Sequence, residues 1–324
     1  MNMTNNLHTL ILYILYGDFG LLTIVPYFLF KILFPIITSF YLLQLFLLES
    51  DLLKILSFKL DKGLNKFGLS SNTLLPLLLG FGCVTVALGT LQLTENKRER
   101  RIAQILLCMI IPCSAQLVIN TVLIFQTGKS YLMAYILVIS FLFLISGYLL
   151  NRCFPGSSPP PKGSIQTYKR RYHFMFPKIW PLLCRSVGSS MAFLAETAVP
   201  FAVGNVIVSI LSYCGLIHKL CMFTAPLFCN FLKLPEDAAA IFILSIIKKD
   251  LGAASLLALF SNGNFTEAQI FICTVMLTLF VPCLASMIIL WKHERKWIAM
   301  GIWILCLLLS IMIGKILCIL LILP

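Results

Sequence analysis

Apolar positions in this chain run on for about 20 residues at a time, and short charged stretches separate these runs. A helix needs roughly 20 apolar residues to cross the hydrocarbon core of a bilayer. The short alternating segments that barrel strands require do not occur. The pattern therefore predicts an all-α polytopic membrane protein with about 8–9 helical segments. These segments are residues 22–48, 74–93, 102–126, 130–151, 186–215, 218–234, 236–260, 266–291 and 297–323.

Composition strengthens this prediction. The chain is 60% hydrophobic and 11% charged, and its mean hydropathy is +0.97. Soluble domains carry about 25% charged residues. A soluble globule of this length could not bury so much apolar surface, because a sizeable part of any folded chain still faces solvent. We therefore expect a multi-pass protein of the cytoplasmic membrane.

The net charge of +13 is concentrated in three short stretches, which hold 13 of the 25 Lys and Arg. They are residues 95–101 (ENKRERR), 152–178, which contain no acid, and 292–296 (KHERK). Short loops rich in Lys and Arg stay cytoplasmic. Even numbers of apolar segments separate the three, so all of them are expected on the cytoplasmic face. Because spans keep them apart, no nucleic-acid partner is expected.

A Pro-, Gly- and Ser-rich linker, residues 154–166, divides the chain. Its three consecutive prolines cannot continue a helix. The division predicts a first repeat with its following spans (1–151), a basic Pro-rich cytoplasmic loop (152–178) and a second repeat (179–324).

Two segments are less regular. Residues 51–69 interleave lysines with apolar residues at helical spacing, which is typical of an amphipathic helix at the membrane interface. The count of segments places it on the face opposite the basic loops. Segment 218–234 is short and contains Lys219 and Pro226, so it either spans the membrane or lies in the interface.

The two halves share a motif. Ile-Pro-Cys-Ser-Ala at 111–115 is matched by Val-Pro-Cys-Leu-Ala at 281–285, 170 residues later. Repeated halves with broken helices are typical of secondary transporters, which bind substrate near the midplane. The sequence leaves open whether the repeats are inverted or parallel.

Cysteines accompany the predicted helix breaks. Cys83 follows a Gly-Phe-Gly break, and Cys113 and Cys283 each follow a proline. Cys thiolates bind soft or borderline metals, so these three are candidate metal ligands. Glu196, a lone carboxylate in an apolar run, is a fourth candidate, because its oxygens suit divalent cations. The alternatives are that the thiols pack as small hydrophobic groups and that the glycines allow close helix packing.

Charged and hydroxyl side chains extend this candidate path. Lys248, Lys249 and Asp250 interrupt segment 236–260, and charges at membrane depth usually pair or line a wet path. A gate or counter-ion pair is one interpretation, and a helix end in water is the other. The predicted path-lining residues are Thr85, Ser114, Lys248 and Asp250.

No enzyme motif accompanies these residues: a P-loop, a dinucleotide fingerprint, a zinc-protease helix and a nucleophile elbow are all missing from the sequence. We therefore expect a transporter and not an enzyme. No cofactor is expected to be bound in the chain.

The run LLPLLLGFGCVTVALGTLQLTENKRERRIAQILLCMIIPCSAQ resembles the membrane region of the FeoB family of ferrous-iron transporters. AETAVPFAVGN, LPEDAAAIFILSIIKKDLGAASL and LTLFVPCLASMI resemble the second Gate repeat of the same family. The resemblance implies two Gate repeats with broken helices that carry Fe(II) inward. It also implies a GTPase domain, a separate GTPase or a small FeoA-like protein as partner, and allows a homo-oligomer.

The chain departs from the family at several points. No P-loop is present, so GTP would act only through a separate domain or protein. Val84-Thr85-Val86 stands where the commoner form has Asn-Val-Pro, and Gln116 stands where it has Arg. A Gate-type transporter for a nucleoside or other organic solute, and a membrane scaffold without transport, are therefore the alternatives.

Overall fold

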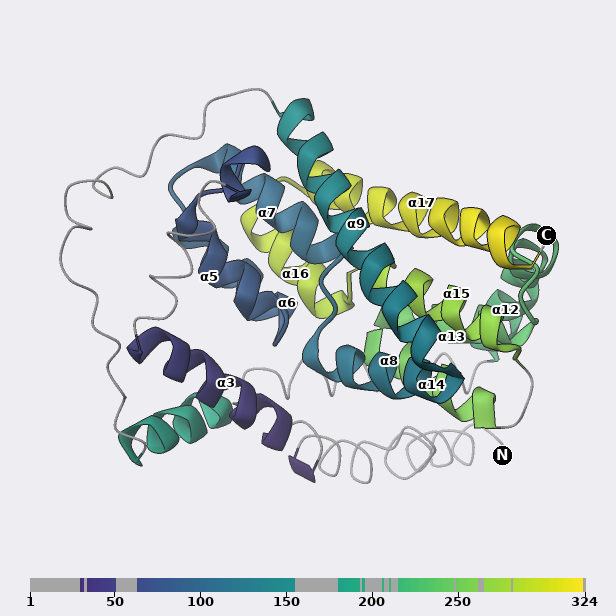
Figure 1. Ribbon diagram of the computed structural model, residues 1–324, viewed down its shortest axis with the longest axis horizontal. Helices are drawn as coiled ribbons and strands as arrows, with labels where there is room; N and C mark the ends of the chain where they lie inside the picture. The colour runs from purple at the N-terminus through teal and green to yellow at the C-terminus, as the bar shows by residue number, and fades with distance from the viewer. Residues whose placement is uncertain are drawn as a thin grey trace, which may run out of the picture.

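The computed structural model describes residues 30–31, 34–50, 63–154, 180–192, 194–195, 206, 210, 215–247, 249–261, 265–280 and 282–322. Within these ranges every regular element is a helix, as the sequence predicts (Figure 1). Two helices are long and apolar enough to cross a membrane, α9 (Lys129–Cys153) and α17 (Lys296–Leu321). The others are shorter, so the number of spans stays a prediction.

The same order of helices occurs twice. Four short helices precede each long one, and the second set begins roughly 170 residues after the first. The first set is α5 (Ser71–Gly80), α6 (Val84–Thr90) with the 3₁₀ turn η2 (Leu91–Leu93), α7 (Lys97–Met109), α8 (Ser114–Thr127) and α9. The second is α13 (Asp237–Ile247), α14 (Lys249–Ser261), α15 (Glu267–Leu279), α16 (Leu284–His293) and α17. Outside both sets lie α3 (Phe34–Glu49), α12 (Leu216–Pro226) and the π-helical turn η3 (Leu227–Phe231).

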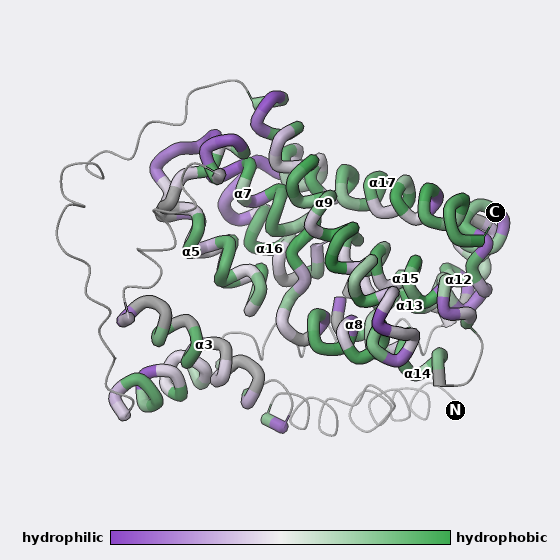
Figure 2. Tube along the Cα trace, in the orientation of Figure 1, coloured by the Kyte–Doolittle hydropathy of each residue, from purple (hydrophilic) through white to green (hydrophobic). Residues whose placement is uncertain are grey.

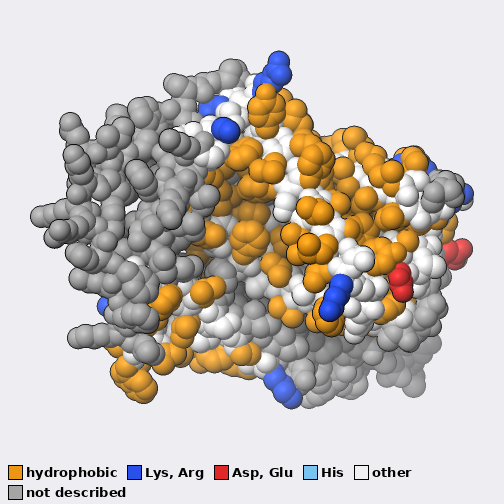
Figure 3. Space-filling view, viewed as in Figure 1, with side chains coloured by type: hydrophobic (Ala, Val, Ile, Leu, Met, Phe, Trp, Pro, Cys, Tyr) orange, Lys and Arg blue, Asp and Glu red, His pale blue; other side chains and the backbone are white. Residues whose placement is uncertain are grey.

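The equivalent short helices α7 and α15 form the centre of the molecule. Every residue from Ile102 to Met109 and from Ile270 to Leu279 is buried. The long helices lie outside them, and Figures 2 and 3 show that α9 and α17 carry mostly apolar side chains on the face in view. The core is therefore made by the short helices, and the long ones present an apolar surface suited to lipid.

The predicted helix breaks occur at the prolines and at the paired glycines. α7 ends before Pro112 and α15 ends before Pro282, because proline has no N–H to donate to the preceding turn. In each case the residue after the proline is extended: ψ is 162° at Cys113 and 159° at Cys283. Each then serves as the N-cap of the next helix.

Segment 74–93 was expected as a single interrupted span, and this expectation is wrong. α5 begins beside α7, where the Glu99 carboxylate accepts hydrogen bonds from the backbone N–H of Ser70 and the Thr73 hydroxyl. α6 and η2 then lead back to Asn96, whose side chain caps the start of α7. Both ends of α5–α6 therefore lie on one face, and the segment is a re-entrant hairpin.

Segment 236–260 also folds back instead of crossing. A Cβ atom built on Gly252 of α14 would lie 2.6 Å from Ser245 Cβ and 2.9 Å from the Ile241 carbonyl oxygen of α13. In a continuous helix, residues seven apart would be separated by about 10 Å. Hydropathy alone cannot separate such a hairpin from a span, because both are apolar over the same length.

The expected position of residues 51–69 is also wrong. Residues 51–69 were placed opposite the basic loops, but Asn151 Nδ2 donates to the Lys66 carbonyl at 2.8 Å. Arg98 donates to Phe154 O and Asn151 O, so residues 63–69 lie beside the basic stretches. Residues 51–62 lie outside the described part. Lys66 thus joins the other basic residues instead of contradicting the positive-inside rule.

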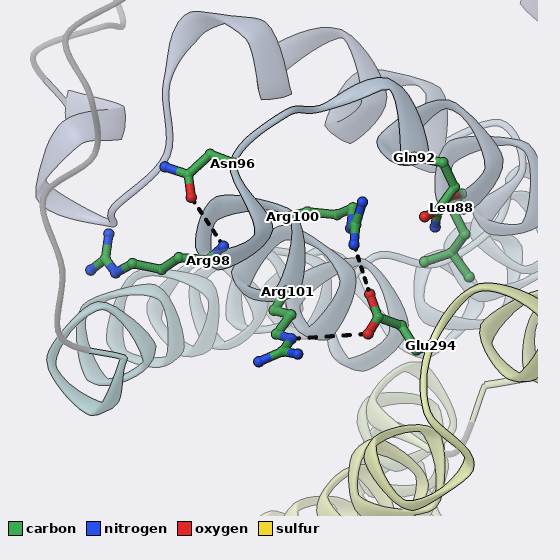
Figure 4. Close-up of polar contacts among 7 residues, drawn as sticks. All are labelled: Leu88, Gln92, Asn96, Arg98, Arg100, Arg101 and Glu294. Carbon is green, nitrogen blue, oxygen red and sulfur yellow. Dashed lines mark hydrogen bonds and ion pairs between the residues drawn. The ribbon is translucent and has the colours of Figure 1, made fainter.

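Ion pairs hold the basic stretches together. Arg100 Nη2 and Arg101 Nε lie 3.5 and 3.9 Å from the two carboxylate oxygens of Glu294 (Figure 4). Arg98 meets the end of α9, where the stretch 152–178 begins. The prediction that the basic stretches share one face is confirmed for residues 95–101, residues 292–296 and the start of 152–178. We call this face the basic face. Residues 155–178 lie outside the described ranges.

The two repeats run in opposite directions. From the basic face, α7 and α8 lead away, and α9 returns to end there at Cys153. In the second repeat α15 and α16 lead toward the basic face, and α17 departs from it at Lys296. At the far end, Lys315 Nζ of α17 donates to Phe231 O and Gln269 Nε2 of α15 donates to Lys233 O. The repeats are therefore inverted, the question that the sequence left open.

We predict the sidedness of single introduced cysteines, in a background where the exposed Cys153 and Cys184 are replaced by serine. Cysteines at Lys66, Glu95 and His293 should react with an impermeant thiol reagent from one side of a vesicle. Those at Lys129, Lys233 and Glu267 should react from the other. Labelling of position 66 from the side of position 233 would contradict the α5–α6 hairpin.

A second prediction tests the α13–α14 hairpin. Gly252→Ala should lower stability by about 1–3 kcal/mol, because the added methyl group overpacks against α13 backbone. Gly301→Ala in α17 is the control: a Cβ there meets nothing within 4 Å, and alanine favours the helix by about 0.5–1 kcal/mol. Unfolding in detergent measures both. Equal effects of the two substitutions would contradict the close packing.

Candidate functional site

Three short helices begin where the broken segments change direction, and each has a cysteine as N-cap. Cys83 precedes α6, Cys113 precedes α8 and Cys283 precedes α16. A helix N-terminus leaves backbone N–H groups without intrahelical acceptors and carries partial positive charge. The cysteines therefore occupy the positions where a negative sulfur is best stabilised by the backbone.

Side-chain contacts connect the N-termini of α6 and α16, which belong to different repeats. Cys283 Sγ lies 3.2 Å from Ser286 Oγ, and Ser286 Oγ lies 3.3 Å from Thr85 Oγ1 on α6. Cys83 lies two residues before Thr85, at the start of the same helix. The chain thus brings sulfur and hydroxyl groups from both inverted repeats to one place.

The N-terminus of the third helix, α8, is connected to the start of α6 by a backbone hydrogen bond. Ser114 N donates to Gly82 O at 3.1 Å, which ties the first residue of α8 to the turn of the α5–α6 hairpin. Cys83, Thr85, Cys113, Ser114 and Cys283 are all partly buried. Five of the eight candidate residues therefore lie in neighbouring turns, as expected from their positions at breaks.

Three candidates fall outside what the structure describes: Glu196, Lys248 and the side chain of Asp250. Among the described residues, no group of three or more His, Cys, Asp or Glu side chains could hold a metal ion. A cation at this place would therefore be held by thiols together with hydroxyl and carbonyl oxygens.

A second polar cluster was missed by sequence reasoning. The last carbonyl groups of a helix have no intrahelical donors, and α15 ends in the buried core. Three helices supply donors to three successive carbonyls of α15, which we call the C-terminal turn of α15. Ser310 Oγ donates to Met276 O at 2.9 Å, Gln116 Nε2 to Leu277 O at 3.0 Å, and Lys249 Nζ to Thr278 O at 3.1 Å.

Asn120 and Tyr135 complete this cluster around the Thr278 hydroxyl. Asn120 Nδ2 donates to Thr278 Oγ1 at 3.1 Å, and the Tyr135 hydroxyl lies 2.9 Å from it. The amide oxygens of Gln116 and Asn120 accept no hydrogen bond from the described residues, although both side chains are fully buried. The spacing of four between Gln116 and Asn120 places them on one helix face, and this was the available sequence signal.

Short re-entrant hairpins, broken helices and inverted repeats define a class of α-helical membrane transport protein. Comparison with known proteins narrows this class. Residues 30–130 match the Gate family, described as "Nucleoside recognition". The Fe(2+) transporter FeoB of Staphylococcus aureus (strain COL) is 22% identical over 288 residues, which are 81% of this chain and 42% of that protein.

A second relative is the Fe(2+) transporter FeoB of Methanocaldococcus jannaschii, 24% identical over 307 residues, or 82% of this chain and 44% of that protein. No solved structure matches the chain. The chain is thus similar to Gate proteins over residues 30–130 and to FeoB over most of its length, while spanning less than half of these relatives.

The C-terminal turn of α15 generates a prediction. Gln116→Leu should lower stability by about 1–3 kcal/mol, because Leu277 O then stays buried without its donor. Gln92→Leu is the matched control: Gln92 Nε2 also donates to a backbone carbonyl, Leu88 O, but within its own helical stretch and near the basic face (Figure 4). Thermal unfolding in detergent should show the larger loss for Gln116→Leu, and the reverse order would contradict the role of this turn.

Proposed function

We propose that this chain is a membrane permease subunit that carries Fe(II), or another divalent metal, across the cytoplasmic membrane. One observation carries the proposal: Cys283 of one repeat is linked through Ser286 to Thr85 of the other. Similarity to two proteins named as Fe(2+) transporters supports the choice of metal.

The donor chemistry suits a borderline cation that must also leave. Thiolate, hydroxyl and carbonyl groups together bind first-row metals without the closed four-ligand geometry of a structural site. A bound metal displaces the thiol proton. Because Cys83 and Cys283 begin helices of opposite repeats, a rocking movement of one repeat against the other would separate them and open the site to one side.

Energy and partners come from outside the residues described. The sequence contains no P-loop, so we propose that a separate GTPase domain or protein, or a small FeoA-like protein, meets the basic face. That face presents Arg98, Arg100 and Arg101 beside residues 63–69. Association of two or more copies within the lipid bilayer is also compatible with the apolar outer surface of α9 and α17.

A second candidate function is transport of a nucleoside or other organic solute. The family description "Nucleoside recognition" and the unsatisfied amide oxygens of Gln116 and Asn120 favour it, because amides can bind a polar solute by hydrogen bonds. Thermal stabilisation separates the two functions: Fe(II) or Mn(II) should raise the unfolding midpoint if the cargo is a metal, and nucleosides should do so if it is a solute.

The experiment that tests the proposal is Fe(II) uptake into proteoliposomes, with and without a candidate GTPase. Cys283→Ala and Ser286→Ala should each reduce uptake by roughly 10–100-fold, the usual loss when a metal ligand or its supporting group is removed. Cys318→Ala is the control, because Cys318 is a fully buried thiol that lies in α17 away from the helix breaks. Equal uptake by Cys283→Ala and the unchanged protein would overturn the proposed path.

A further inference from the structure

Lys249 is a charged side chain in the interior of the molecule. It begins α14, is 6% exposed, and its ammonium donates to Thr278 O at 3.1 Å. A lysine near a helix end normally extends its amine toward water. This one extends inward instead, to a backbone carbonyl at the end of a broken helix.

The surroundings of the Lys249 ammonium favour positive charge. The C-terminus of a helix carries partial negative charge, and Thr278 lies one residue before the end of α15. The thiols of Cys108, in the last turn of α7, and of Cys306 are near enough to interact with the ammonium electrostatically. Within the described residues no carboxylate lies at ion-pair distance from Lys249, so backbone and dipolar groups provide much of its stabilisation.

Buried oxygens that accept no hydrogen bond lie on the side chains that hold the same turn. Gln116 binds the carbonyl next to that of Thr278, and Asn120 binds the Thr278 hydroxyl, yet both amide oxygens remain unsatisfied among the described residues. Carbonyl and amide oxygens are the ligands that hard cations prefer. Half-helix C-termini are also where transporters with broken helices hold coupling cations.

We propose that the C-terminal turn of α15 is a monovalent-cation site and that the ammonium of Lys249 fills it. The chain thus supplies, as a tethered side chain, the charge that a soluble coupling ion would otherwise bring. This inference concerns the occupant of the turn and does not depend on which cargo the path carries.

Chemical rescue tests this proposal on the full chain in detergent. Lys249→Ala removes a fragment equivalent to n-propylammonium. In tetramethylammonium chloride, the unfolding midpoint of the Lys249→Ala protein should lie several degrees below that of the unchanged protein. In n-propylammonium chloride at equal ionic strength it should recover, because n-propylammonium has N–H donors and tetramethylammonium has none. Potassium should give partial recovery. The unchanged protein should respond equally to all three salts.

Three variants serve as controls. Lys249→Met fills the volume without charge, so n-propylammonium should not raise its midpoint. Lys315→Ala removes a lysine that also donates to a carbonyl, Phe231 O, but at an exposed position, so it should show no salt-specific recovery. Lys249→Gln keeps an N–H donor without charge and should unfold between the alanine variant and the unchanged protein.

Two results would overturn the cation site. One is a Lys249→Ala protein with the same midpoint in n-propylammonium and tetramethylammonium. The other is a Lys249→Gln protein as stable as the unchanged one, which would show that charge is not needed. If Lys249→Ala can be purified only in n-propylammonium, the proposal is supported, and failure to recover it in any of the salts counts against a site open to free cations.

Discussion

The need to satisfy the ends of broken helices inside an apolar core governs this molecule. Each break leaves carbonyl groups on one side and N–H groups on the other, and no water-filled surface is available to most of them. The breaks are tolerated because side chains of other helices supply the partners: Gln116, Lys249 and Ser310 for α15, and Glu99 for the start of α5. The stability of the fold therefore depends on polar groups that one helix supplies to the end of another.

The sequence was sufficient to predict the helical class, the breaks at Pro112 and Pro282 and the shared face of the basic stretches. It was insufficient to predict direction. A re-entrant hairpin and a span have the same length and hydropathy, so segments 74–93 and 236–260 were interpreted as interrupted spans. That error also misplaced residues 51–69. Only the contacts of Gly252 with α13, and of Ser70 and Thr73 with Glu99, distinguish the two arrangements.

The candidate site was predicted only in part. The sequence shows which residues lie at a helix break, but it does not show which residue of the other repeat each of them contacts. Cys83, Thr85, Ser114 and Cys283 were identified by their breaks. Ser286, which links Thr85 to Cys283, gave no signal of its own. The two departures from the FeoB pattern, Thr85 and Gln116, both make contacts between the repeats.

The two kinds of helix end explain how a buried ammonium can lie near the proposed path for cations. The cysteines cap helix N-termini, where negative charge is favoured, whereas Lys249 caps a C-terminus, where positive charge is favoured. Gln116, which binds the turn that also holds Lys249, lies two residues after Ser114, so the two places are neighbours. The Lys249 ammonium is thus stabilised by the end of α15, and a thiolate formed on metal binding would be stabilised by the start of its own helix. In the proposed path, a metal at the thiols would be repelled by the tethered ammonium, and this repulsion would favour release of the cation.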